Sequence, residues 1–196
     1  MRPDSKARAD YVEAFLQIVS RIAASLEQAP KAALPIKMYV AGGAALHFYT
    51  GERVSRDVDA VFSRRIALPD DLDIAYRDAD GAARLLYFDR QYNDTLSLMH
   101  EDAYDDSIPL SLEGIDAAVL DVRLLAPLDL AVSKISRFSE RDRSDIASLV
   151  RHRGISSRAL RQRAQEALAR YVGNVDRVRG SIELACRIAA DEESRR

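Results

Sequence analysis

The sequence predicts an α/β (α+β) protein, with a mixed sheet flanked by helices and followed by a C-terminal helical bundle. Three observations lead to this expectation. The apolar run Met38 to Ala41 meets a Gly42-Gly43 turn, as a buried strand does where it enters a helix. Short apolar runs recur between residues 57 and 125. After Pro127 the apolar residues instead recur at helical spacing.

An N-terminal helix is expected first. From about Asp10 to Glu27 the apolar residues fall on one face of a helix, and Pro30 and Pro35 then interrupt the chain. A short helix is expected over Ala44 to Tyr49, because Gly51 is well placed to end it. Helices therefore precede and follow the first strand.

Strands are expected in the middle of the chain. Asp57 to Phe62 and Ala117 to Leu125 contain the apolar residues of two of them. Leu85 to Phe88 form another apolar run, and Leu96 and Leu98 alternate with polar residues. These segments would supply the rest of the sheet.

The C-terminal third is expected to be helical. Pro127 suits the first position of a helix, and Ser139 followed by Asp142 resembles a capping box with Asp in place of Glu. Two more helices are expected over about Ser157 to Tyr171 and Val175 to Ala190.

Composition limits the domain organisation and the class of protein. The 196 residues, 47% of them hydrophobic, are enough for one core with a helical annex, so we expect a core at 1–125 and a helical region at 126–196, or one continuous domain. The single cysteine, Cys186, excludes an internal disulfide and a thiolate zinc cluster. No apolar run approaches the roughly 20 residues of a membrane span, and Met1 to Asp10 lacks a signal-peptide core, so a cytoplasmic protein is expected.

Charge is distributed unevenly along the chain. Residues 1–133 contain 14 basic and 22 acidic side chains, whereas residues 134–196 contain 15 basic and 9 acidic ones. Such asymmetry indicates either a surface for phosphates or nucleic acid, or ordinary solvated helix faces.

The Gly42-Gly43 turn is the first candidate for chemistry. Glycines at a strand–helix junction let the backbone approach a ligand closely, and the helix N-terminus offers N–H groups and the positive end of its dipole. Both features suit a phosphate. A tight turn without a ligand is the alternative.

The pair Asp57 and Asp59 is the strongest candidate. Residues two apart on a strand point to the same side, so these carboxylates would lie together among apolar neighbours. They would repel each other and resist desolvation unless a cation lay between them, and Mg²⁺ or Mn²⁺ meets that need. The alternative is an exposed acidic strand end, or a turn capped by Asp57.

Asp121 is a candidate third carboxylate. It lies in the expected strand from Ala117, on the face opposite Leu120 and Val122. It would complete a three-carboxylate metal site if this strand neighboured that of Asp57. A local partnership with Arg123 is the alternative.

These residues carry a family resemblance. Tyr39-Val-Ala-Gly-Gly-Ala-Ala-Leu46 followed by Arg53-Val-Ser-Arg-Asp-Val-Asp59 resembles the signature of the DNA polymerase β-like nucleotidyltransferase superfamily, a Gly-Gly or Gly-Ser turn and then a D-x-D. The Arg-x-Ser-x-Asp-x-Asp form is similar to the AbiEii-type branch, which includes toxins of bacterial toxin–antitoxin and phage-abortive systems. Asp129-Leu-Ala-Val-Ser-Lys134, with Arg137 and Arg141-Asp-Arg-Ser-Asp145, resembles later motifs of that branch.

The resemblance implies roles for matched residues. Asp57 and Asp59 would hold the metal, Lys134 would meet the triphosphate or the leaving pyrophosphate, and Asp142, with Asp145 as its alternative, would be the later acidic group. Gly43 stands where many members have Ser, so a hydroxyl to phosphate is absent. The residues expected to contact the nucleotide are Gly42, Gly43, Ser55, Arg56, Lys134 and Arg137.

The function expected is metal-dependent transfer of NMP from an NTP to an acceptor, such as RNA or tRNA, in the manner of a toxin with a cognate antitoxin protein. The alternatives are a catalytically inactive nucleotide-binding or protein-interaction module, or an enzyme acting on a small hydroxylated acceptor. The arginines expected to hold an RNA acceptor are Arg151, Arg153, Arg158, Arg161 and Arg163.

Overall fold

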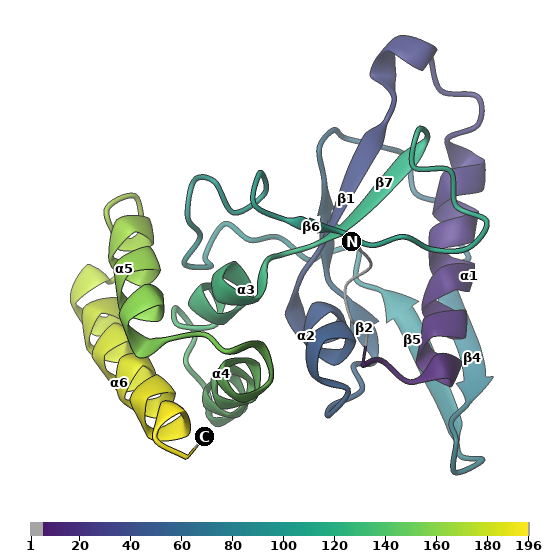
Figure 1. Cartoon of the computed structure of the whole chain (residues 1–196). Helices are drawn as coiled ribbons and strands as arrows, with labels where there is room; N and C mark the ends of the chain where they lie inside the picture. The colour runs from purple at the N-terminus through teal and green to yellow at the C-terminus, as the bar shows by residue number, and fades with distance from the viewer. Residues whose placement is uncertain (1–5, 196) are drawn as a thin grey trace. The chain divides into compact units, whose positions relative to one another are not determined.

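The computed structural model describes residues 6–195 and confirms the predicted mixed α and β fold (Figure 1). The chain forms two compact units. Of the described residues, the core unit contains 6–92 and 107–124, and the helical unit contains 93–106 and 125–195. The beginning of the polar stretch Met1 to Asp10 lies outside the described residues.

The described residues of the core unit form two β-sheets. The first has the strand order β3-β1-β7-β6, with β1 parallel to β7 and antiparallel to β3. Its strands are β1 (Ile36–Val40), β3 (Ala60–Phe62), β6 (Ile108–Pro109) and β7 (Leu120–Leu124). The second has the order β2-β5-β4, with β2 parallel and β4 antiparallel to β5. Its strands are β2 (Asp57–Val58), β4 (Asp73–Arg77) and β5 (Ala83–Phe88).

The predicted strand over 57–62 is two strands that belong to different sheets. Val58 ends β2 and Ala60 begins β3, so the chain passes from one sheet to the other at Asp59. The Ala41 N–H donates to the Asp59 carbonyl oxygen at 2.8 Å, which extends the pairing of β1 and β3 to the end of β1. Asp59 is therefore fixed at the point where β1 meets the following helix.

Two helices complete the described core unit together with the short 3-10 turn Lys31–Ala33. Helix α1 (Ala9–Ser25) packs against β4 and β5 (Figure 1). Its buried face includes Phe15, whose ring meets Phe48 edge-on with centroids 5.1 Å apart. Phe48 belongs to α2 (Gly42–Thr50), which ends at Gly51 in the left-handed conformation, as predicted.

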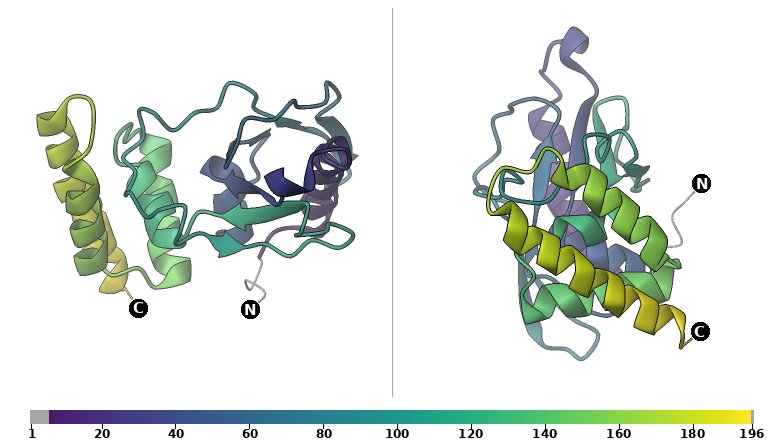
Figure 2. Two further views of the ribbon diagram at one scale, coloured as in Figure 1. Left: turned by 90° about the horizontal axis from the view of Figure 1, so that it is seen from above. Right: turned by 90° about the vertical axis from the view of Figure 1, so that its left-hand side faces the viewer.

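The helical unit contains α3 (Pro127–Ser133), α4 (Glu140–Arg153), α5 (Ser157–Leu168) and α6 (Val175–Glu193). The last two run side by side in both views of Figure 2. The segment 93–106 belongs with these helices, since Glu101 pairs with Arg170 and His100 Nε2 lies 3.4 Å from the Glu166 carboxylate.

Three further strands differ from the sequence-based expectations, among them the two-residue β6, which was not predicted. The alternation at Leu96 and Leu98 forms no strand: Leu96 lies in a turn and is exposed, whereas Leu98 lies in irregular backbone and is buried. Strand β4 was not predicted, although Leu72 and Ile74 are buried at the spacing of a strand. None of the described helices is long and apolar enough to cross a membrane.

Phe15→Ala should lower the free energy of unfolding by about 3–5 kcal/mol, because it removes a fully buried ring and leaves a cavity beneath α1. Urea unfolding followed by circular dichroism measures the change. Gln17→Ala, on the exposed face of the same helix, is the control and should change the free energy by less than about 0.5 kcal/mol. Equal effects of the two substitutions would contradict this assignment of the buried face.

Candidate active site

The turn between β1 and α2 has no room for a side chain at Gly42. This glycine has φ +56°, and a Cβ added to it would lie 2.7 Å from Asp59 Cγ. The Asp59 side chain therefore occupies the space directly over Gly42. The N-cap residue of α2 is Ala41, which has no polar group with which to cap the first amides of the helix.

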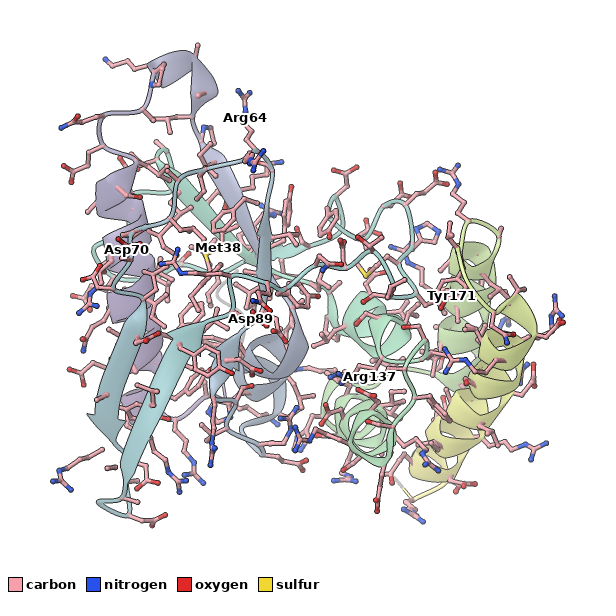
Figure 3. The ribbon with its side chains drawn as sticks, turned by 180° about the vertical axis from the view of Figure 1, so that it is seen from behind. Met38, Arg64, Asp70, Asp89, Arg137 and Tyr171 are labelled. Atoms are coloured by element: carbon pink, nitrogen blue, oxygen red, sulfur yellow. The ribbon has the colours of Figure 1, made fainter. Side chains whose placement is uncertain are left out.

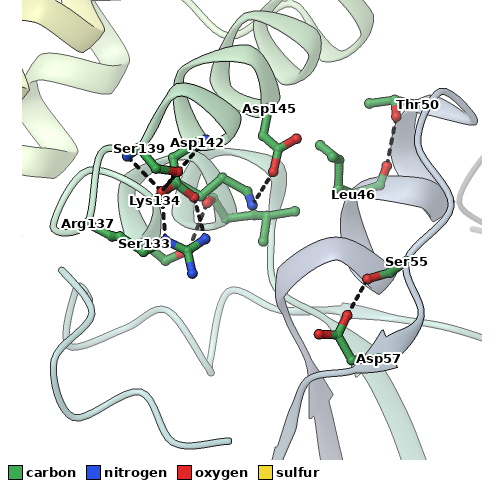
Figure 4. Close-up of polar contacts among 11 residues, drawn as sticks. Leu46, Thr50, Ser55, Asp57, Ser133, Lys134, Arg137, Ser139, Asp142 and Asp145 are labelled. Atoms are coloured by element: carbon green, nitrogen blue, oxygen red, sulfur yellow. Dashed lines mark hydrogen bonds and ion pairs between the residues drawn. The ribbon is translucent and has the colours of Figure 1, made fainter. Parts of the chain in front are cut away.

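Asp57 is held beside the same turn through Ser55. A Cβ added to Gly43 would lie 2.9 Å from Ser55 Cβ, so the two residues are in close contact. The buried Ser55 hydroxyl donates to Asp57 Oδ1 (Figure 4). Both predicted metal-binding carboxylates thus lie against the first turn of α2, Asp59 directly and Asp57 through Ser55.

The negative charges of both carboxylates raise the pKa of two tyrosines, Tyr87 and Tyr11. The negative charge of Asp57 is the main cause that raises the pKa of Tyr87, which faces Asp57 across the β2–β5 pairing; burial, Asp89 and Asp59 add to it. Burial chiefly raises the pKa of Tyr11, and Asp57 and Asp59 raise it further. The two aspartates therefore form one concentration of negative charge.

Asp89 is an acidic neighbour that the sequence analysis missed. It follows β5, and its N–H donates to the Val58 carbonyl oxygen at 3.1 Å, so it extends the parallel pairing alongside Asp59 (Figure 3). Its Oδ1 accepts from the Gln91 N–H at 2.9 Å. In the sequence, Asp89 is recognisable only as an acidic residue directly after an apolar run. The register of β2 and β5 is needed to show that it lies beside Asp59.

The structure does not bring Asp121 to the pair. Asp121 is opposite Lys37 near the start of β1, whereas Asp59 is bonded to Ala41 just beyond its end. Four residues of strand separate these positions, or about 13 Å. Asp121 instead pairs with Arg123 at 3.1 Å, which is the local partnership considered above. We therefore leave Asp121 out of the candidate metal site.

The donor set at the turn fits a hard divalent cation that completes its coordination elsewhere. Among residues 6–195 no three acidic, histidine or cysteine side chains are grouped so that they could hold one ion. Two carboxylates remain, and Mg²⁺ is commonly bound by one or two carboxylates together with water and substrate phosphates. Such a cation would depend on the substrate for part of its coordination.

In the helical unit, Lys134 is used in a buried ion pair. Its Nζ donates to Asp145 Oδ2 at 2.7 Å, and both side chains are almost fully buried (Figure 4). Lys134 follows α3 and Asp145 lies on α4, so the pair joins two helices. Removal of either partner would leave a buried charge without its counter-ion.

Asp142, in the first turn of α4, is bound by Ser139 and Arg137, which precede the helix. Asp142 and Ser139 make the capping box that the sequence predicted, and Arg137 adds two hydrogen bonds, from Nε at 2.8 Å and from a terminal nitrogen at 2.7 Å (Figure 4). Burial alone would raise the pKa of Asp142, but the hydrogen bonds from Arg137 and Ser139 outweigh it and lower the pKa to about 2. Both oxygens of this carboxylate thus have partners within the helical unit.

Several arginines of the C-terminal helices are also ion-paired. Arg151 Nε lies 3.0 Å from Glu192, Arg161 pairs with Glu183, and Arg163 binds Asp129 at 2.8 Å. The positive charge counted in the sequence is partly neutralised by these contacts. This weakens the case for a nucleic-acid surface on these helices.

Ser55 and Arg56 also line a cavity of about 540 Å³ within the core unit. It lies between the segment 52–56 and the first residues of β5. The sequence singled out Arg56 as a nucleotide contact, but neither Arg53 of the same segment nor Arg8 and Arg84, which come from distant parts of the chain.

The glycine turn, the two adjacent carboxylates and the mixed sheet together define a nucleotidyltransferase-like core. A comparison with protein families agrees: residues 15–185 match the family described as "Nucleotidyltransferase of unknown function (DUF6036)". The match spans most of the chain, which therefore belongs to this family. No curated protein and no solved structure matches the chain.

Gly42→Ala should destabilise the core unit by about 1–3 kcal/mol, because the new methyl group meets Asp59 in a backbone conformation that is itself unfavourable for alanine. Gly81→Ala is the matched control: it has φ +79° but no atom within 4 Å. Urea unfolding of both variants separates the collision from the backbone strain. Equal losses would show that Asp59 does not fill the space over Gly42.

Asp142→Asn should reduce the free energy of unfolding by about 1–2 kcal/mol at pH 7. Because the folded pKa of Asp142 is about 2, below the ordinary 3.8, its ionised form stabilises the fold above about pH 4 and this contribution is lost as the pH falls toward 2. The difference between wild type and variant should be constant from pH 5 to 8 and narrow below pH 4. A difference that stays constant down to pH 2 would contradict this origin, and Glu140→Gln is the exposed control.

Proposed function

We propose that this protein transfers a nucleotidyl group from an NTP to an acceptor, with a divalent cation bound by Asp57 and Asp59. One observation supports this most: both carboxylates lie against the first turn of a helix whose N-cap residue cannot cap it. That turn attracts phosphate, whereas the carboxylates repel it. A cation between phosphate and carboxylates reconciles the two.

The protein's own residues would place the donor. Gly42 and Gly43 let the side chains of Asp59 and Ser55 lie directly against the start of α2, so a cation held by the carboxylates would bring phosphate oxygens close to that helix end. Ser55 holds one oxygen of Asp57 and leaves the other for binding. When bound, Mg²⁺ or Mn²⁺ would neutralise phosphate charge and favour in-line attack at the α-phosphorus.

The transfer itself is balanced without another reactant. The acceptor oxygen forms a bond to the α-phosphorus, the bond from that phosphorus to the oxygen bridging to the β-phosphate breaks, and pyrophosphate leaves. The proton of the acceptor hydroxyl passes to water.

Other parts of the expected function stay predictions. They are the contact of Lys134 with the triphosphate or pyrophosphate, the acidic role of Asp142 or Asp145, an RNA acceptor, membership of the AbiEii-type branch, and a toxin role with a cognate antitoxin. The hydrogen bonds of Asp142 favour a structural role for this carboxylate. Lys134 would have to leave Asp145 in order to bind a phosphate.

A second function has one observation in its favour. Because residues 6–195 contain no group of three metal-binding side chains, the protein could bind a nucleotide without transferring it. Such a module would be stabilised by NTP and Mg²⁺ but would show no turnover.

Asp59→Asn should reduce transfer of label from α-³²P-NTPs in the presence of Mg²⁺ at least about 100-fold, because it removes a charge from the proposed cation site. Labelled RNA, protein and small acceptors are separated and counted. Asp121→Asn is the matched control, because it makes the same change at the other end of the sheet, and it should keep activity within about threefold.

Equal activity of wild type and Asp59→Asn would overturn the proposal. Stabilisation of the wild type by NTP and Mg²⁺ in a thermal melt, with no transfer of label to any acceptor, would favour the second function instead.

A further inference from the structure

The cavity beside Asp57 is rich in arginine. Its wall includes Arg8, Arg53, Arg56 and Arg84, against the two acidic residues Glu52 and Asp78. These arginines come from the segment before α1, from the segment between α2 and β2, and from β5. The fold therefore gathers an excess of positive charge at one place in the core unit, whose sequence carries 14 basic and 16 acidic side chains.

Arg84 is fixed in position by a buried carboxylate. Its Nε donates to Asp78 Oδ2 at 2.7 Å, and Asp78 in turn accepts from the N–H groups of Asp80 and Ala82. Within the described part of the chain the terminal amino groups of Arg84 have no acceptor. Asp78 thus orients a guanidinium group whose remaining donors are available to a ligand.

Arg56 adds an uncompensated charge. Its side chain makes no hydrogen bond or ion pair with residues 6–195, whereas its carbonyl oxygen accepts from the Tyr87 N–H at 2.9 Å. The backbone bond holds Arg56 beside Tyr87 of β5, in the cavity wall and one residue before Asp57. A guanidinium group in this position would meet any anion that enters the cavity.

Two tyrosines give the cavity an aromatic surface. Tyr76 and Tyr87 line it, and Tyr87 is 37% exposed. Aromatic rings beside arginines are the combination that proteins use to stack nucleobases and bind the attached phosphate. The volume of about 540 Å³ falls in the range of small-ligand pockets and would hold a nucleotide.

The cavity adjoins the candidate active site without including its glycine turn or its aspartates. Ser55, which binds Asp57, and Tyr87, which faces Asp57, belong to its wall. A terminal nitrogen of Arg53 would lie 3.2 Å from a Cβ added to Gly43. A ligand in the cavity would therefore lie next to the donor phosphates proposed above.

We propose that this arginine cavity binds a nucleoside monophosphate unit, either free or at the end of a strand, without a metal ion. Four arginines against two acidic residues leave a surplus of charge that matches the roughly −2 charge of a phosphate monoester. A triphosphate carries more charge and is better matched to the cation site. The assignment of this unit as the acceptor rests on the proposed function, whereas its binding does not.

Isothermal titration of the full chain with 5′-AMP in EDTA tests the binding apart from catalysis. Wild type should bind, and Arg56→Gln should weaken binding at least about tenfold. Arg77→Gln, at the end of β4 and outside the cavity wall, removes the same charge from the core unit; it is the control and should bind within about twofold of wild type. Asp59→Asn should also bind in EDTA, although it should lose Mg²⁺-dependent transfer.

Other probes define the ligand. Adenosine and ribose 5-phosphate should each bind at least about tenfold more weakly than 5′-AMP, and Tyr87→Leu should lose the preference for 5′-AMP over ribose 5-phosphate. Tighter binding of a 5′-phosphorylated dinucleotide than of 5′-AMP identifies the end of a strand, and the reverse order identifies a free nucleotide.

Three results would overturn the proposal. They are no binding of 5′-AMP by the wild type in EDTA, equal binding of adenosine and 5′-AMP, and equal weakening by Arg56→Gln and Arg77→Gln. If binding persists but no variant transfers label, the cavity stands and the proposed function fails. If transfer occurs but 5′-AMP does not bind in EDTA, the proposed function is supported and the cavity proposal fails.

Discussion

The contact between Asp59 and Gly42 is the constraint on which the rest of the core depends. The backbone of Asp59 ends one sheet and begins the other, and its carbonyl oxygen is bonded to the last residue before α2. Its side chain then fills the space that any residue other than glycine would need at position 42. The strand crossing, the start of the helix and the position of the carboxylate are thus one arrangement. Asp57 follows from it, because β2 ends just before Asp59 and Ser55 ties Asp57 to the same turn.

The helical unit uses its charged residues differently. Lys134 and Asp145 neutralise each other where burial would otherwise be unfavourable, and Asp142 is capped and bound by Arg137. A carboxylate with this many donors is a weak base and a poor metal ligand, as its lowered pKa indicates. The sequence motifs suggested catalytic roles for these residues, because an acidic residue at the start of a helix has the same sequence pattern whether it is catalytic or caps the helix. Their contacts favour stabilisation of the helices.

Much of the fold could be predicted because it depends on local patterns. The helices follow apolar periodicity, Gly51 ends α2 in the left-handed conformation, and the Ser139 capping box is visible as two residues three apart. The candidate pair could be predicted for the same reason, since Asp57 and Asp59 are neighbours in sequence.

Contacts that depend on strand register could not be predicted. Asp121 is separated from the pair by four residues of strand, and Asp89 is adjacent to it, yet nothing near either residue in the sequence distinguishes them. The arginine cavity could not be predicted at all, because Arg8, Arg56 and Arg84 meet only in the folded core.

The segment 53–59 carries arginines and aspartates side by side, and the two kinds of charge face different sites. Along it, arginines at 53 and 56 line the cavity, whereas the aspartates at 57 and 59 lie against the turn of α2. Carboxylates can accept a phosphate only through a cation, and guanidinium groups can accept one directly. Two phosphorylated groups could therefore be bound next to each other by unlike means, one dependent on a divalent ion and one independent of it. Each would be excluded from the other's place by charge, since a bare monophosphate is repelled by the aspartates and a bound cation is repelled by the arginines. An enzyme that must orient a donor and an acceptor in one direction gains from such a distinction, because the two substrates cannot exchange positions.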